Sequence, residues 1–190
     1  MLSLKFTKEF WNLLILQVPF LICAFWALPR SWKKIKAAFT EKIYHQLWLI
    51  IFLNFALGLV LNLFLPMENV IPKQIETFQA MGLIPAFLLA CLVAPIAEEC
   101  FFRFVIFDNF RENNLLPYLL SFFGFIIMHI GWFNFTNFSS LIFQLFSFCL
   151  SAFYFIYIYR ISGWNLTFPI VVHFLNNLTF LIVIFTRYQA

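Results

Sequence analysis

Long apolar stretches separated by short polar segments dominate this sequence. Six such runs lie at about residues 10–28, 43–65, 82–107, 115–133, 139–159 and 166–186. Each run reaches or approaches the roughly 20 residues that a helix needs to cross the hydrocarbon core of a bilayer. The pattern therefore predicts an all-α protein, a polytopic transmembrane helix bundle of about six spans.

The composition agrees with a chain whose solvent is lipid. Hydrophobic residues make up 64% of the 190 positions and charged residues only 11%, whereas a soluble domain is about half apolar and a quarter charged. The formal net charge is +4, but the basic residues cluster between apolar runs. We therefore interpret them as topology signals and expect the lipid bilayer, with no nucleic acid, as the surroundings of the protein.

The distribution of lysine and arginine predicts the orientation. Five basic residues fall between Arg30 and Lys42, and cytoplasmic loops carry an excess of such residues. This segment is predicted to be a basic cytoplasmic loop between the first two spans, which places both termini outside. The expected location is the cell membrane, with multiple passes.

The third run contains charges that oppose its insertion. From Ile84 to Phe107 it holds 13 Leu, Ile, Val or Phe residues, which favour insertion by roughly 4–8 kcal/mol together. Three charged side chains near a helix centre cost about 7.5–10.5 kcal/mol. These residues, Glu98, Glu99 and Arg103, are therefore expected to face the bundle interior and to pair.

Helix geometry predicts how the three charges divide. Glu99 and Arg103 are four residues apart on one face, with the acid first, which favours an ion pair. Glu98 lies about 100° around the helix and can face elsewhere. Pro95 has no N–H to donate and is predicted to free the carbonyl of Cys91, opening or kinking the helix just before the carboxylates.

Two later runs also carry polar side chains, at His129 and at His173 and Asn177. Each alone is typical of helix packing or of a hydrogen bond between helices. Together with the carboxylates they form the parts of a hydrolytic centre. A carboxylate can remove a proton from water, and imidazole and amide groups can orient that water or stabilise an oxyanion. Alternatively, a carboxylate and two histidines can hold zinc.

The predicted spans leave one inconsistency in this grouping. Glu98 lies on the cytoplasmic side of the centre of its run, and His129 lies on the outer side of its own. At 1.5 Å per residue, this is an offset in depth of roughly 13 Å. Helix tilt, a kink at Pro95 or misplaced run ends must close that gap if His129 belongs to the site.

Three motifs, each in a separate span, carry a family resemblance. They are Glu98-Glu99-x-x-x-Arg103, Phe125-x-x-x-His129 and His173-x-x-x-Asn177. In this order they closely resemble the motifs of the CPBP family, the CAAX prenyl endopeptidases and bacteriocin-processing (Abi-type) intramembrane proteases. The resemblance covers about residues 82–180. We therefore expect residues 1–81 to form two N-terminal spans with the basic loop, and residues 82–190 to form a CPBP-like catalytic core.

The resemblance implies a role for each motif residue. Glu98 would be the general base that activates water, and His129 would help to bind that water. His173 and Asn177 would stabilise the tetrahedral oxyanion.

The remaining two motif residues would support the base. Glu99 would orient the network, and Arg103 would fix Glu99. A mechanism without a metal cofactor is the favoured hypothesis, because only one carboxylate and one imidazole would face the water. Zinc held by Glu98, His129 and His173 is the alternative.

The sequence thus predicts an intramembrane endopeptidase that hydrolyses a peptide bond in a membrane-bound peptide or protein. Prenylated or bacteriocin-type precursors are the expected substrates. One alternative is a non-catalytic bacteriocin-immunity or binding protein on the same scaffold. Another is a proton-coupled transporter, which the lack of a second copy of the Glu-Glu segment disfavours.

Overall fold

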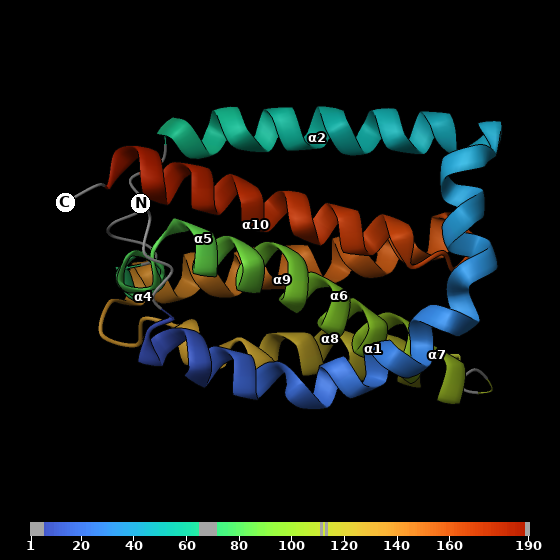
Figure 1. Ribbon diagram of the computed structural model, residues 1–190, viewed down its shortest axis with the longest axis horizontal. Coiled ribbons are helices and arrows are strands. Elements are labelled where there is room, and N and C mark those ends of the chain that lie inside the picture. The colour runs from blue at the N-terminus through green and yellow to red at the C-terminus, as the bar shows by residue number, and fades with distance from the viewer. Residues whose placement is uncertain (1–5, 65–71, 111, 113, 189–190) are drawn as a thin grey trace.

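The computed structural model of the protein describes residues 6–64, 72–110, 112 and 114–188, and this part of the chain contains helices and turns but no β-strand. The separate helices are α1 (Lys8–Thr40), α2 (His45–Phe64), α4 (Pro72–Met81), α8 (Leu116–Met128), α9 (Phe138–Ile161) and α10 (Thr167–Arg187). A further helix runs from Leu83 to Asn109. The long helices run side by side, and α1 begins at the end of the bundle where α10 ends (Figure 1).

The predicted polytopic bundle is confirmed. Five helices among the described residues are long and apolar enough to cross a membrane: Lys8–Thr40, Lys42–Val60, Leu83–Asn109, Phe138–Ile161 and Thr167–Arg187. The fourth apolar run forms a shorter apolar helix. The protein is therefore a multi-pass membrane protein.

The fourth run is short because its α-helix stops at Met128. His129 has φ −91° and ψ 0°, and a 3₁₀ turn over Ile130–Trp132 follows it. The carbonyl of His129 accepts the N–H of Trp132 at 3.0 Å. The 13-residue helix is about 20 Å long, which is less than the roughly 30 Å hydrocarbon core.

The segment that was predicted to be a basic loop between the first two spans is mostly helical. The segment that begins at Arg30 continues α1 as helix as far as Thr40, and it crosses one end of the bundle before α2 begins (Figure 1). Its Lys, Ala and Ile residues are compatible with a helix. Pro29 lies inside α1 immediately before this segment, and proline disrupts the ladder of helix hydrogen bonds.

The crossing segment of α1 is tied to the turn between α9 and α10. Lys34 Nζ donates to the carbonyls of Gly163 and Trp164 at 3.0 and 3.3 Å. Asn165, which is fully buried, donates in turn from Nδ2 to the Lys34 carbonyl at 2.6 Å. These bonds fix the end of the bundle.

The turn itself ends α9 with a Schellman motif. The N–H of Gly163 donates to the carbonyl of Arg160 at 3.2 Å, and the N–H of Trp164 donates to that of Tyr159 at 2.9 Å. Gly163 has φ +68° and Trp164 has φ +63°. The left-handed backbone explains why glycine stands at position 163.

The helix from Leu83 to Asn109 contains two π-helical stretches. Its segments are α5 (Leu83–Ala86), a π-helical stretch η2 (Phe87–Val93), α6 (Ala94–Glu99), a second π-helical stretch η3 (Cys100–Val105) and α7 (Ile106–Asn109). π-Helical turns widen a helix and often mark functional sites. The two carboxylates therefore sit in a short α-helical segment between two widened turns.

Pro95 leaves a different carbonyl open from the one that was predicted, because the helix before it is π-helical. In η2 the N–H of Ala94 donates to the carbonyl of Leu89, five residues back. The next carbonyl in this register is that of Ala90, not Cys91, and the residue opposite it is Pro95, which has no N–H.

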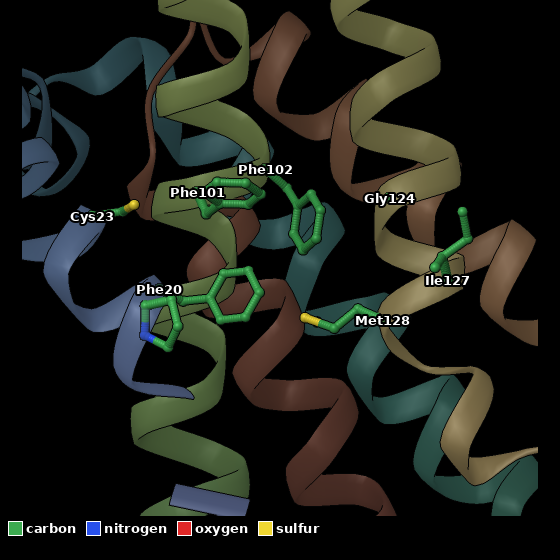
Figure 2. A pocket seen from close by; sticks show the side chains of 8 residues that line it. Phe20, Cys23, Phe101, Phe102, Gly124, Ile127 and Met128 are labelled. Atoms are coloured by element: carbon green, nitrogen blue, oxygen red, sulfur yellow. The ribbon is translucent and has the colours of Figure 1, made fainter. Parts of the chain in front are cut away.

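An apolar groove of about 380 Å³ opens between α1, η3 and α8 (Figure 2). Its lining residues are Pro19, Phe20, Cys23, Phe101, Phe102, Gly124, Ile127 and Met128. One of the lining rings, that of Phe102, has its centroid 5.9 Å from the guanidinium carbon of the buried Arg103, so the wall of the groove also contacts a charged residue inside the bundle.

Replacing Gly163 with alanine is expected to lower stability by about 1–2 kcal/mol, because a side chain disfavours the left-handed backbone. Thermal unfolding of the detergent-purified protein measures this change. Gly58→Ala is the matched control, since an added Cβ there meets no atom within 4 Å and Gly58 lies inside α2. An unchanged melting temperature for Gly163→Ala would contradict the turn assignment.

Candidate active site

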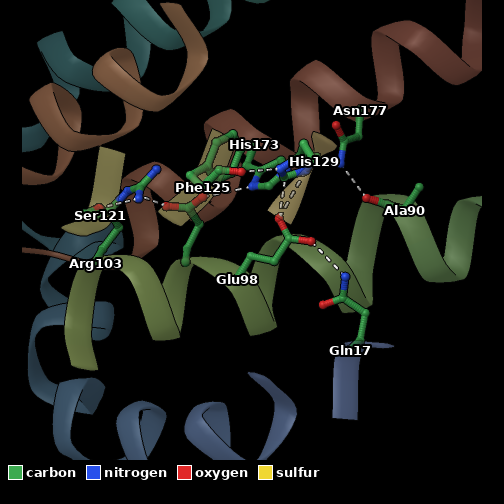
Figure 3. A network of polar contacts seen from close by, with 10 residues as sticks. Gln17, Ala90, Glu98, Arg103, Ser121, Phe125, His129, His173 and Asn177 are labelled. Carbon is green, nitrogen blue, oxygen red and sulfur yellow. Dashed lines mark hydrogen bonds and ion pairs between the residues drawn. The ribbon is translucent and has the colours of Figure 1, made fainter. Parts of the chain in front are cut away.

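Polar side chains from four elements converge inside the bundle (Figure 3). The central helix supplies Glu98, Glu99 and Arg103. The other polar residues are His129, which caps the end of α8, His173 and Asn177 on α10, and Gln17 on α1. The two glutamates and the arginine are at most 3% exposed. The structure thus encloses these charges within the protein, as their insertion cost requires.

Glu99 and Arg103 form the predicted ion pair. Arg103 Nε lies 3.0 Å from Glu99 Oε2, and both side chains are fully buried. Arg103 also donates from a terminal guanidinium nitrogen to the hydroxyl of Ser121 on α8, at 2.7 Å. The arginine therefore links the central helix to α8.

Three aromatic rings surround the guanidinium group. Its carbon lies 5.9, 5.5 and 5.6 Å from the ring centroids of Phe102, Phe125 and Phe155, respectively. Ring faces attract cations at this range, and more strongly in the absence of water. The rings and Glu99 together stabilise a charge that has no contact with solvent.

His173 joins α10 to the same ion pair. Its Nδ1 lies 2.9 Å from Glu99 Oε1, so Nδ1 is the donor to the ionised carboxylate. The imidazole stacks on Phe155 with centroids 4.8 Å apart and an interplanar angle of 21°. This orientation turns Nε2 towards Glu98, at 4.0 Å from Oε2.

His129 also faces Glu98, so the depth offset expected from the sequence is closed. Its Nδ1 lies 2.8 Å from the carbonyl of Phe125 and must donate to it. Its Nε2 then points at Glu98 Oε2, 3.7 Å away. The expected offset was measured from the centre of a full-length span, whereas the fourth run forms an α-helix only over Leu116–Met128.

Glu98 has two oxygens with different surroundings. Oε1 accepts a hydrogen bond from Gln17 Nε2 at 2.8 Å. Oε2 faces the two imidazoles at 3.7 and 4.0 Å, beyond direct hydrogen-bonding distance. In a neutral His129 with a protonated Nδ1, Nε2 is an acceptor, as is Oε2. One water molecule can donate a hydrogen bond to each of them.

Asn177 lies one turn beyond His173 on α10 and contacts the widened turn of the central helix. Its Nδ2 donates to the carbonyl of Ala90 at 2.7 Å, which is the carbonyl opposite Pro95. The amide thus satisfies the backbone group that the proline leaves open. One amide hydrogen remains for the oxyanion role predicted from the sequence.

Sequence reasoning did not identify two residues of this network, Gln17 and Ser121. Both stand inside apolar runs, where a polar side chain is costly, and this is the signal that could have indicated them. Ser121 also precedes Phe125 by one helical turn. The partner of neither residue can be read from spacing, because each contact joins two different helices.

The three candidate zinc ligands are spaced more widely than a zinc site requires. Zinc bonds of 2.0–2.2 Å in a tetrahedron place ligand atoms about 3.4 Å apart, whereas Glu98 Oε2 lies 3.7 Å from His129 Nε2 and 4.0 Å from His173 Nε2. Among the described residues, no group of three or more His, Cys, Asp or Glu side chains is arranged so that it could hold a metal ion. No catalytic step is therefore assigned to a metal.

Comparison with known proteins gives a family match over the second half of the chain. The family model described as type II CAAX prenyl endopeptidase Rce1-like matches residues 80–179. That range contains Glu98, Glu99, Arg103, His129 and His173, with Asn177 near its end. No curated protein and no solved structure matched the chain.

Replacing Arg103 with leucine is expected to destabilise the protein by about 3–5 kcal/mol, because Glu99 loses its buried partner. The double variant Glu99→Leu/Arg103→Leu should recover much of this loss, since no unpaired charge remains. Thermal unfolding in detergent measures both variants. Arg160→Leu, at an exposed position at the end of α9, is the control. Equal destabilisation of the single and double variants would disprove the pairing argument.

Proposed function

The chain belongs to the Rce1-like family of type II CAAX prenyl endopeptidases and is thus an intramembrane protease, and we propose that Glu98 activates water for peptide hydrolysis. The observation that carries the proposal is the position of Glu98 Oε2, which faces two imidazole nitrogens inside a bundle of apolar helices. A carboxylate in that position can act as a general base towards one bound water.

The first chemical step forms a tetrahedral intermediate. Glu98 Oε2 removes one proton from the water while His129 Nε2 accepts a hydrogen bond from the other. The water oxygen attacks the carbonyl carbon of the scissile peptide bond, and the electron pair of the C=O bond moves to the oxygen. Glu98 then carries the proton.

The negative oxygen of this intermediate requires hydrogen-bond donors. His173, when protonated on both ring nitrogens, donates from Nδ1 to Glu99 and from Nε2 to the oxyanion. In this intermediate Glu98 is neutral, and the charges of Glu99, the oxyanion, Arg103 and the imidazolium sum to zero in the apolar interior. Asn177 supplies its second amide hydrogen to the same oxygen.

The second step breaks the peptide bond. The intermediate collapses, the carbonyl reforms, and the C–N bond electrons pass to the leaving nitrogen. Glu98 transfers its proton to that nitrogen, so the base is regenerated and the products are a carboxylic acid and an amine. Arg103 and Glu99 hold His173 in place throughout.

The surroundings of the site favour a membrane-associated substrate in the cell membrane. The groove-lining residues Pro19, Phe101 and Met128 lie two, three and one positions along the chain from Gln17, Glu98 and His129, respectively. An apolar chain or side chain of the substrate can lie in that groove while the scissile bond reaches Glu98. Prenylated CAAX peptides and bacteriocin-type precursors have such a group beside a cleavable peptide.

Replacing Glu98 with glutamine is expected to lower kcat by about 10²–10⁴-fold, because the amide cannot take the proton of water. Cleavage of a panel of lipid-anchored and leader-type peptides by the purified protein in vesicles measures this change. Glu41→Gln, at an exposed position after α1, should cleave at the wild-type rate. Undiminished cleavage by the Glu98 variant would disprove the proposed function.

Chelators are expected to leave cleavage unchanged, because the proposed steps use only protein groups and water. The measurement is the initial rate of peptide cleavage after dialysis against EDTA or 1,10-phenanthroline. A loss of activity that stoichiometric zinc restores would instead support a metal held by Glu98, His129 and His173.

A further inference from the structure

Gln17 makes a contact with the proposed base that the family match does not include. It lies on α1, outside the matched residues 80–179, and 81 positions separate it from Glu98 along the chain. Its Nε2 donates to Glu98 Oε1 at 2.8 Å, and Figure 3 shows its side chain directed at the carboxylate from the side opposite the two imidazoles.

The chemistry of the two groups determines the direction of this bond. An ionised carboxylate has no hydrogen and can only accept, so the amide nitrogen of Gln17 faces it. Hydrogen bonds to charged groups contribute about 1.5–3 kcal/mol, roughly twice as much as neutral ones. The bond therefore fixes Oε1 and leaves Oε2 directed at His129 and His173.

The placement of Gln17 in the first span supports a specific role. Between Leu13 and Leu28, Gln17 is the only residue with a carboxamide side chain. Its Oε1 is buried without a hydrogen-bond partner among the described residues. A buried, half-satisfied amide destabilises the protein, so the bond to Glu98 is the interaction that accounts for a glutamine here.

We propose that Gln17 is a positioning residue for hydrolysis, which selects Oε2 as the oxygen of Glu98 that removes the proton from water. This inference rests on the proposed function of Glu98. It assigns a part in the reaction to α1, whose sequence carries no family motif. Gln17 acts on the carboxylate and does not itself contact the scissile bond.

Two substitutions of Gln17 separate positioning from packing. Gln17→Leu removes the hydrogen bond and should lower kcat by about 10- to 100-fold, with KM unchanged. Gln17→Glu keeps the shape but places a second carboxylate beside Glu98. Two such carboxylates share a proton, so the low-pH limb of the kcat profile should move upward by about one pH unit or more, with activity recovering at high pH.

Asn12→Leu and Asn12→Asp are the matched controls, since Asn12 is an exposed carboxamide on the same helix. Both should retain the wild-type kcat and pH profile. Thermal unfolding of every variant in detergent shows whether a loss of activity reflects a loss of folding. If Gln17→Leu does not fold, the pH profile of Gln17→Glu still tests the proposal.

The outcomes also distinguish this inference from the proposed function. If Glu98→Gln abolishes cleavage but the profile of Gln17→Glu coincides with that of the wild type, positioning by Gln17 is wrong and the role of Glu98 stands. If Glu98→Gln cleaves normally, both fail. A displaced profile for Gln17→Glu, together with inactive Glu98→Gln, supports both.

Discussion

The ion pair between Glu99 and Arg103 is the interaction on which the polar centre depends. Neither charge could remain alone among apolar helices, where a buried ion without a partner costs several kcal/mol. As a pair, they reach two other helices: the arginine contacts Ser121 on α8, and the glutamate contacts His173 on α10. The same interaction that makes the charges tolerable therefore positions the second histidine.

Widened π-helical turns flank the segment that carries Glu98 and Glu99, and they determine how the ion pair is placed in the bundle. The first widened turn accommodates Pro95 and presents the Ala90 carbonyl to Asn177. The polar residues of α10 thus hold the central helix at two points, through the ion pair and through its backbone. The geometry of the proposed active site and the packing of the helices depend on the same hydrogen bonds.

Interactions within one helix could be predicted from the sequence, and contacts between helices could not. The Glu99–Arg103 pair follows from a spacing of four residues, and the multi-pass helical bundle follows from the apolar runs, the fourth of which forms only a shorter helix. The freed carbonyl was misplaced by one residue because a π register cannot be read from the position of a proline. Gln17 was missed because its contact with Glu98 depends on how α1 packs.

The shortness of α8 has a consequence for the surrounding lipid. Its α-helical part is about 20 Å long, which is roughly 10 Å less than the hydrocarbon thickness. Lipids beside a helix that is shorter than the hydrocarbon core can relieve the mismatch by local thinning of the bilayer. His129 follows the last residue of this helix, so local thinning there would shorten the path of water and of a peptide backbone from the aqueous phase to the site.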